Sequence, residues 1–251
     1  MRRTYTSECL GMLRKGFSGA ESVKTNYSQA FQDIFTLSVL NGKRNGCYVE
    51  IGGWHGTSDS NTYLLETLFD WIGFAVEWNP EYVERYNVVR KNRCLCLNAL
   101  TIDYEEIFQE MRFPSQIDYL QVDISPAKNT LEALKRQPFE KRRYSVITFE
   151  TDAYMYGKGP KEEAKSLLLS LGYELLAEDV KILGNPFEDW YVDPEVVGWE
   201  AVHNLRSHGL ECSDCVVDSA MSQESKKTCA SMAVGTNKQI SFVDDGWEEM
   251  P

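Results

Sequence analysis

Residues 47–56 read Cys-Tyr-Val-Glu-Ile-Gly-Gly-Trp-His-Gly, and this segment says more about the fold than any other in the 251-residue chain. An apolar run ends at Glu50 and Ile51, opens into a glycine-rich turn and is followed by a helical pattern over residues 60–70. A strand, a glycine loop and a helix in this order are typical of doubly wound α/β sheets, in which the loop backbone approaches a nucleotide-like cofactor. The loop reads E-x-G-x-x-x-G. It therefore completes neither the dinucleotide pattern G-x-G-x-x-G nor the phosphate-binding pattern G-K-[ST], and it has no basic residue to meet a phosphate.

Apolar runs and amphipathic segments alternate along most of the chain. Strands are predicted at residues 47–51, 72–77, 93–98, 117–124, 144–150 and 173–183, and helices at 27–40, 60–70, 80–91, 103–111, 128–136 and 160–171. Strands separated by helical patterns indicate βαβ units and a mostly parallel sheet. We therefore expect an α/β domain over residues 27–200 and an N-terminal extension over 1–26. Residues 201–251 are expected to form a polar, partly disordered C-terminal tail with a candidate strand at 239–243.

Composition and charge restrict the classes of partner and location. The net charge of −12 argues against a nucleic-acid partner, because such binding needs Lys and Arg to neutralise phosphates. The densest basic run, residues 141–143, is read as a solvated turn. No apolar run is long enough to span a bilayer, and the basic N-terminus lacks the apolar core of a signal peptide. The seven cysteines look like small core residues of a reducing compartment, so we expect a cytoplasmic, intracellular protein.

Acidic residues stand at the carboxyl ends of four predicted strands. Glu50, Glu77 and Asp123 end the first, second and fourth strands, and Glu150 with Asp152 ends the fifth. Ligands of open α/β sheets bind outside these ends, so the five carboxylates should converge and repel one another. Such charge is retained when a cation, an amine or catalysis requires it, although any one of these acids could instead cap a helix.

Six segments resemble, in order and spacing, the FkbM-type family of S-adenosylmethionine-dependent methyltransferases. They are YSQAFQD (27–33), YVEIGGWHGTSDSNTYLLE (48–66), WIGFAVEWNP (71–80), IDYLQVDIS (117–125), YSVITFETDAY (144–154) and EDWYVDP (188–194). The resemblance implies a class I methyltransferase (Rossmann-like) fold: a doubly wound, mostly parallel seven-stranded sheet with one antiparallel strand near the end and helices on both faces. It also implies S-adenosylmethionine as cofactor and methyl transfer to a hydroxyl group of a sugar or glycan.

The resemblance also implies roles for individual residues. Glu77 is expected to bind the ribose hydroxyls and Asn98 to border the adenine. The full set of implied cofactor-binding residues is Glu50, Gly52, Gly53, Gly56, Ser60, Asn61, Thr62, Glu77, Asn98 and Asp123. Asp123, Glu150 and Asp152 are the predicted catalytic residues, acting as a general base or as oxygen ligands of a divalent cation such as Mg²⁺ or Mn²⁺.

Two departures from the family pattern keep other functions open. Residues 123–127 read Asp-Ile-Ser-Pro-Ala where many relatives have an Asp-x-Glu-Gly turn, and Thr151 stands where close relatives often have histidine. A catalytically altered cofactor-binding module is therefore one alternative. A nucleotide-cofactor oxidoreductase is a second, which the incomplete glycine pattern disfavours. His55 is read as a loop residue facing solvent. A zinc site formed by His203, His208, Cys212 and Cys215 is outweighed by a loose tail, because there is no second C-x-x-C.

Overall fold

A single sheet runs through the molecule. The computed structural model describes residues 5–198 and 202–218. Its strands lie in the order β3-β2-β1-β4-β5-β7-β6-β8. Their bounds are β1 Cys47–Ile51, β2 Ile72–Glu77, β3 Arg93–Cys96, β4 Gln116–Val122, β5 Arg143–Glu150, β6 Glu174–Ile182, β7 Asn185–Val192 and β8 Ser207–His208.

The strand directions confirm the predicted fold class. The neighbours from β3 to β5 are parallel, whereas β7 runs antiparallel to both β5 and β6. A mostly parallel sheet with one reversed strand between the fifth and sixth is the class I methyltransferase, Rossmann-like arrangement. The reversal follows from the turn at Leu183 and Gly184, whose φ values of 53° and 85° suit a tight hairpin. The two-residue strand β8, parallel to β6, adds an eighth strand to the predicted seven.

Four helices begin within one residue of their predicted starts: α3 (Pro80–Val89), α4 (Tyr104–Glu110), α5 (Ala127–Lys135) and α7 (Gly159–Ser170). The helices α1 (Gln32–Val39) and α2 (Tyr63–Phe69) begin five and three residues later than predicted. Asn79 accepts a hydrogen bond from Glu81 N (3.0 Å) and Asp103 accepts one from Glu106 N (3.1 Å), which caps α3 and α4. Pro80 is the first residue of α3, where the missing N–H costs nothing. The four-residue helix α6 was not predicted. The α-helices are α1 Gln32–Val39, α2 Tyr63–Phe69, α3 Pro80–Val89, α4 Tyr104–Glu110, α5 Ala127–Lys135, α6 Ala153–Tyr156, α7 Gly159–Ser170 and α9 Cys212–Val216, and the 3-10 helices are η1 Ser7–Met12, η2 Ala20–Ser22 and η3 His203–Leu205.

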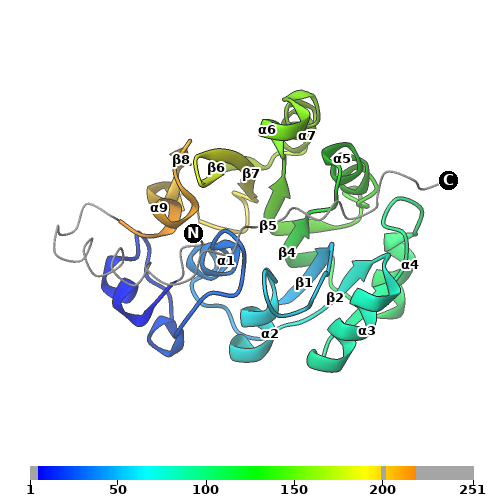
Figure 1. Cartoon of the computed structure of the whole chain (residues 1–251), viewed down its shortest axis with the longest axis horizontal. Coiled ribbons are helices and arrows are strands. Elements are labelled where there is room, and N and C mark those ends of the chain that lie inside the picture. Colours follow the sequence, from blue (N-terminus) through cyan, green and yellow to red (C-terminus); the bar gives the residue numbers. More distant parts are fainter. Residues whose placement is uncertain (1–4, 199–201, 219–251) are drawn as a thin grey trace.

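Helices cover both faces of the sheet (Figure 1). One buried cluster joins α1, α2 and α9 to the sheet through side chains such as Phe35, Leu65 and Trp190. A second cluster joins α4, α5 and α7 to the opposite face through side chains such as Phe108 and Leu134. The two clusters are apolar and continuous, so burial of both faces holds the strand ends in fixed positions.

Both flanks of the predicted domain contribute to the first of these clusters. Tyr5 and Phe17 lie in it together with Leu205 and Val216. The backbone N–H of Arg14 also donates to Val216 O (2.9 Å). The predicted boundaries at residues 26 and 200 stay a prediction, but the described flanks pack on the domain between them. The candidate strand at 239–243 and the rest of the predicted tail after residue 218 lie outside the described residues.

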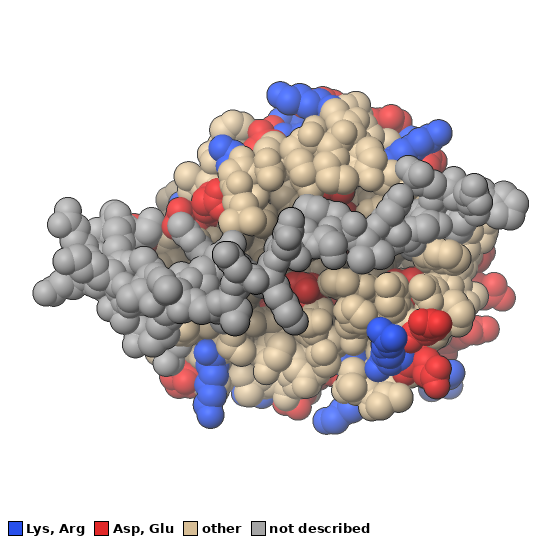
Figure 2. Space-filling view, in the orientation of Figure 1, with Lys and Arg blue, Asp and Glu red and all other residues tan. Residues whose placement is uncertain are grey.

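Two further sequence predictions concern membranes and nucleic acids. No helix within residues 5–198 and 202–218 has both the length and the hydropathy to cross a bilayer. On the face shown in Figure 2, the lysine and arginine side chains of the described residues lie scattered toward the rim. The absence of a nucleic-acid partner and the cytoplasmic location stay predictions.

Candidate functional site

The predicted acids share one edge of the sheet. The strand order reverses direction between β1 and β4, and this switch point is where ligands of open α/β sheets bind. Glu50, Glu77 and Glu150 lie at or next to the carboxyl ends of parallel strands, and Asp123 directly follows β4. The antiparallel strand β7 adds Glu188, which pairs in register with Glu150.

The three loop glycines are required by the protein's own packing. A Cβ on Gly52 would lie 1.9 Å from Asp123 O, and its φ of +94° is a conformation that other residues rarely adopt. A Cβ on Gly56, whose φ is +74°, would lie 2.8 Å from Tyr86 Cδ2. A Cβ on Gly53 would meet Ala75 Cβ at 3.0 Å. The loop therefore passes directly against the backbone that follows β4, whether or not a ligand is bound.

Glu50 is an internal anchor of the loop. Its Oε1 accepts hydrogen bonds from Ser60 Oγ and Asn61 N, both at 3.1 Å. Its Oε2 accepts hydrogen bonds from Thr62 Oγ1 (2.7 Å) and Tyr86 OH (3.1 Å). A carboxylate offers about four acceptor positions, so these four donors occupy Glu50. The predicted motif Ser60-Asn61-Thr62 is thus held by Glu50, and the proposed contact of Glu50 with a cofactor stays a prediction.

Arg90, which the sequence analysis missed, lies beneath the same loop. Its side chain is fully buried and donates to Gly56 O (2.9 Å), Ser60 Oγ (3.1 Å) and Thr62 Oγ1 (2.9 Å). It also donates to Tyr48 OH and to Glu66 Oε2, both at 2.8 Å, and approaches Glu50 Oε2 at 3.9 Å. Burial alone would lower the pKa of Arg90, but Tyr48, Tyr86, Glu50 and Glu66 raise it overall, so the guanidinium stays charged. No sequence signal marks it, because basic residues at the C-terminal end of a helix are usually solvated.

Two polar groups face the loop from either side. Asn61 is 3% exposed, and its Oδ1 has no hydrogen-bond partner within the part of the chain that the structure describes. Buried carbonyl oxygens of this kind are rare, so each suggests a donor that the protein itself does not supply. On the other side, the carboxylate of Glu77 accepts from Trp54 N (3.3 Å) and Asn79 N (2.8 Å). These bonds hold Glu77 against the glycine loop.

A cluster of carboxyl groups lies across from the loop. Burial raises the pKa of Glu150 well above its ordinary value, and the nearby Asp123 raises it further. Burial also raises the pKa of Asp152 to about 7, with a further contribution from Asp123. Glu150 and Asp123 share a hydrogen bond, and burial raises the pKa of both groups. Asp123 is partly buried, whereas Glu150 and Asp152 are 7% and 5% exposed.

Glu188 and Gln32 extend this cluster and were not predicted as site residues. Burial raises the pKa of Glu188 to about 8, while hydrogen bonds from Trp190 and Gln32 oppose the shift. Gln32 Nε2 donates to Glu188 Oε1 at 2.9 Å, which connects the segment YSQAFQD (27–33) to the carboxyl groups. Trp190 is fully buried and belongs to the core.

The carboxyl cluster does not form a ready cation site. Among the described residues, the group of three that brings one ligand atom each within 4.8 Å of the others is Glu178, Asp179 and His208, not Asp123, Glu150 and Asp152. The proton shared by Glu150 and Asp123 already relieves part of the repulsion that a cation would relieve. The structure therefore gives no support to the predicted Mg²⁺ or Mn²⁺ at these three residues.

Other predicted residues have simpler roles. Thr151 is 1% exposed, and its hydroxyl donates to Phe187 O (3.0 Å), so it supports the β5–β7 pairing and offers no base. Asn98 Oδ1 accepts from Leu100 N (2.8 Å) in the turn after β3. His55 is partly buried and stacks on Trp54, with ring centroids 4.3 Å apart. Cys212 and Cys215, from the zinc interpretation, are buried on α9 and belong to the apolar cluster on that face of the sheet.

Comparison with solved structures finds matches with low sequence identity and TM-scores below 0.5. Fibrillarin from Aeropyrum pernix, determined with natively bound S-adenosyl-L-methionine, aligns with 14% identity and a TM-score of 0.46 over 66% of this chain and 74% of its own. A putative rRNA methylase from Clostridium thermocellum aligns with 10% identity and a TM-score of 0.46, over 64% and 92%. The N-methyltransferase NodS from Bradyrhizobium japonicum WM9 aligns with 11% identity and a TM-score of 0.44, over 65% and 94%. No family model and no curated protein matches the chain.

Proposed function

We propose that this protein is an S-adenosylmethionine-dependent methyltransferase that transfers a methyl group to a hydroxyl of a sugar or glycan. The observation that carries the proposal is the packing of the glycine loop against the backbone of Asp123, whose side chain belongs to the carboxyl cluster. Gly52 packs against the carbonyl of Asp123, and Asp123 shares a hydrogen bond with Glu150. A cofactor held by the loop at the switch point would therefore present its reactive group to these carboxyl groups.

The residues around the loop fit this cofactor. Asn61 Oδ1, which has no hydrogen-bond partner among residues 5–198 and 202–218, suits the ammonium group of the methionine part, which has hydrogen-bond donors and no acceptor. Glu77 suits the ribose diol, since a carboxylate can accept two hydroxyl hydrogen bonds. The loop has no basic residue, which suits a cofactor without phosphate and disfavours a dinucleotide.

The carboxyl cluster supports the chemistry of an oxygen acceptor. S-adenosylmethionine supplies an electrophilic methyl group when bound. With a pKa of about 7, Asp152 is the carboxyl group best matched to accept a hydroxyl proton near neutral pH. General-base catalysis of this kind contributes about 10²–10⁴-fold to a rate. One proton shared between Glu150 and Asp123 leaves the pair with one negative charge instead of two adjacent carboxylates.

The residues next to Asp152, where the methyl acceptor would bind, suit a sugar. Helix α6 directly follows Asp152 and carries Tyr154, Met155 and Tyr156, which are 38%, 50% and 43% exposed. Aromatic faces next to carboxyl groups suit the alternation of C–H and hydroxyl surfaces on a sugar ring. The pKa of Tyr154 is raised to about 12 by burial and then by Asp152 and Glu150, which places its phenol near the proposed base.

Calorimetry and a transfer assay test the proposal. S-adenosylhomocysteine should bind to the full chain and NAD should not. Labelled methyl groups should pass from S-adenosylmethionine to members of a sugar and glycan panel, and Asp152→Asn should abolish this transfer. The matched control is Asp70→Asn, because Asp70 is a surface acid at the end of α2. NAD binding instead would favour the oxidoreductase, and cofactor binding without transfer would favour the altered binding module.

Metal dependence is tested separately. Full activity in EDTA would exclude a required cation at Asp123, Glu150 and Asp152. Activity lost in EDTA and restored by Mg²⁺ or Mn²⁺ would support it.

A further inference from the structure

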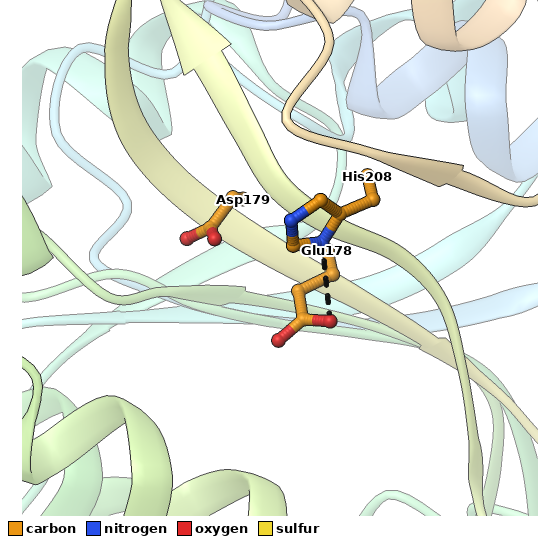
Figure 3. Close-up of side chains that lie close together, drawn as sticks. All are labelled: Glu178, Asp179 and His208. Carbon is orange, nitrogen blue, oxygen red and sulfur yellow. Dashed lines mark hydrogen bonds and ion pairs between the residues drawn. The ribbon is translucent and has the colours of Figure 1, made fainter.

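A second cluster of potential ligands lies away from the carboxyl groups of the proposed active site. Glu178 and Asp179 on β6 and His208 on β8 each place one ligand atom within 4.8 Å of the others (Figure 3). The parallel pairing of β6 with β8 sets Glu178 opposite His208, and His208 Nδ1 lies 3.3 Å from Glu178 Oε2. Strand pairing thus brings together residues about thirty positions apart in the sequence.

An irregularity in β6 explains why two consecutive residues join one cluster. In a regular strand, neighbouring side chains point to opposite faces of the sheet. Here the register between β6 and β7 shifts between Ala177 and Val180, and Asp179 has a φ of +51°. The strand therefore bulges at this point. A bulge can redirect one side chain, so Glu178 and Asp179 reach the same place.

Two lysines hold the carboxylates without using all of their oxygens. Lys165 Nζ lies 2.6 Å from Glu178 Oε1, and Lys161 Nζ lies 2.6 Å from Asp179 Oδ1. Lys161 also approaches Glu178 at 3.5 Å and Asp189 at 3.6 Å, so the two ammonium groups are shared among three carboxyl groups.

A cavity opens beside the cluster. Its volume is about 520 Å³, and it is lined by Glu178 and His208 together with Leu169, Leu175 and Arg206. This volume lies within the usual range of small-molecule sites, about 300–1,000 Å³. The side chain of His208 is 69% exposed, so the cluster is accessible from solvent. An ion bound by these three side chains would have an open coordination position toward the cavity, as catalytic zinc sites do.

We propose that Glu178, Asp179 and His208 bind a divalent transition-metal ion, with Zn²⁺ preferred over Mg²⁺ and Ca²⁺. One imidazole nitrogen and two carboxylate oxygens are an ordinary ligand set for zinc, whereas Mg²⁺ and Ca²⁺ prefer oxygen ligands alone. The proposal does not depend on the proposed methyl transfer. Of the zinc ligands considered from the sequence, only His208 belongs to the proposed site. The other two proposed ligands are acids of β6, not the buried cysteines of α9.

Titration of the metal-free full chain with Zn²⁺, Co²⁺ and Mg²⁺ tests this site. We expect one zinc equivalent to bind here, more tightly than Mg²⁺. The His208→Ala and Asp179→Asn variants should each weaken zinc binding by more than about 10-fold, since even the loss of a residue that only orients a metal ligand costs about that much. His203→Ala is the matched control, because His203 is an exposed histidine on the neighbouring η3 and is outside the cluster.

Cobalt absorption identifies the ligands, because thiolate coordination produces an intense charge-transfer band and nitrogen–oxygen coordination does not. A spectrum without that band, lost in His208→Ala and kept in His203→Ala, supports the site. Zinc affinity that is unchanged in His208→Ala, or no stronger than Mg²⁺ affinity, would overturn the proposal. A thiolate band that persists in His208→Ala would also overturn it, by assigning the ion to cysteine.

Discussion

Replacing Arg90 with methionine should strongly destabilise the protein. The guanidinium is fully buried and donates five hydrogen bonds, and it is the cation beside the carboxylates of Glu50 and Glu66. Methionine keeps much of the stem volume but removes the charge, so both carboxylates would be left without a counter-ion in the interior. Breaking a buried ion pair in this way costs about 3–5 kcal/mol. This loss is large against a typical unfolding free energy of about 5–15 kcal/mol.

Urea unfolding followed by circular dichroism measures this cost. With a slope of roughly 3 kcal/mol per molar urea for a chain of this size, the midpoint should fall by roughly 1–1.7 M. Arg93→Met is the matched control, because Arg93 is an exposed arginine at the start of β3 and should shift the midpoint little. Adding Glu66→Gln to Arg90→Met should recover part of the loss, because one of the two unpaired carboxylates is then removed.

A milder variant connects this network to the cofactor loop. Arg90→Lys keeps the charge but offers a single donor group, so it cannot reach Gly56 O and Thr62 Oγ1 together. We expect it to fold and to bind S-adenosylhomocysteine more weakly than the wild type. A decrease in unfolding free energy below about 1 kcal/mol for Arg90→Met would refute this reasoning, because an unpaired buried carboxylate should destabilise the protein by more than that.

Three further changes should have distinct effects. Gly52→Ala should lower the melting temperature sharply, because its Cβ would lie 1.9 Å from a carbonyl oxygen, whereas Gly159→Ala, with nothing within 4 Å, should not. Methyl transfer should rise with pH through about 7 and then level off, because Asp152 must lose its proton to act as a base; a rate independent of pH between about 6 and 8 would contradict this role. Arg142 lowers the pKa of Glu105 from 4.5 to about 2. Glu105→Gln should therefore cost up to about 1 kcal/mol of unfolding free energy above pH 5, and the difference from wild type should vanish as the pH falls toward 2.

The sequence predicted the sheet well because its signals are local. An apolar run followed by glycines marks strand β1 and its loop in the sequence. Asn79 and Pro80 mark the start of α3. The short helix α6 escaped prediction because four residues are too few to show a period. The two-residue strand β8 escaped for the same reason, and its pairing with β6 is a contact between distant parts of the chain.

The candidate site was predicted less completely. The acids at strand ends could be located, because the carboxyl ends of parallel strands meet at one edge of a sheet. Arg90 and Gln32 could not, because what distinguishes them is burial against partners far away in the sequence. The sequence also gave no means of knowing that Glu50 would be fully occupied by its own loop, since four donors from two separate segments converge on it only in the folded chain.

The packing of both flanks on one face of the sheet has a consequence for folding during synthesis. Every buried member of the cluster beneath α4, α5 and α7 comes from residues 47–191. The buried members of the cluster on the other face come from a longer stretch of the chain, from Tyr5 to Val217. On the ribosome, the face covered by α4, α5 and α7 can therefore be completed while the other face still waits for residues 202–217. Until then the N-terminal segment has only part of its apolar surface covered, so we expect a nascent chain that ends before residue 202 to bind chaperones more strongly than one extended past residue 218.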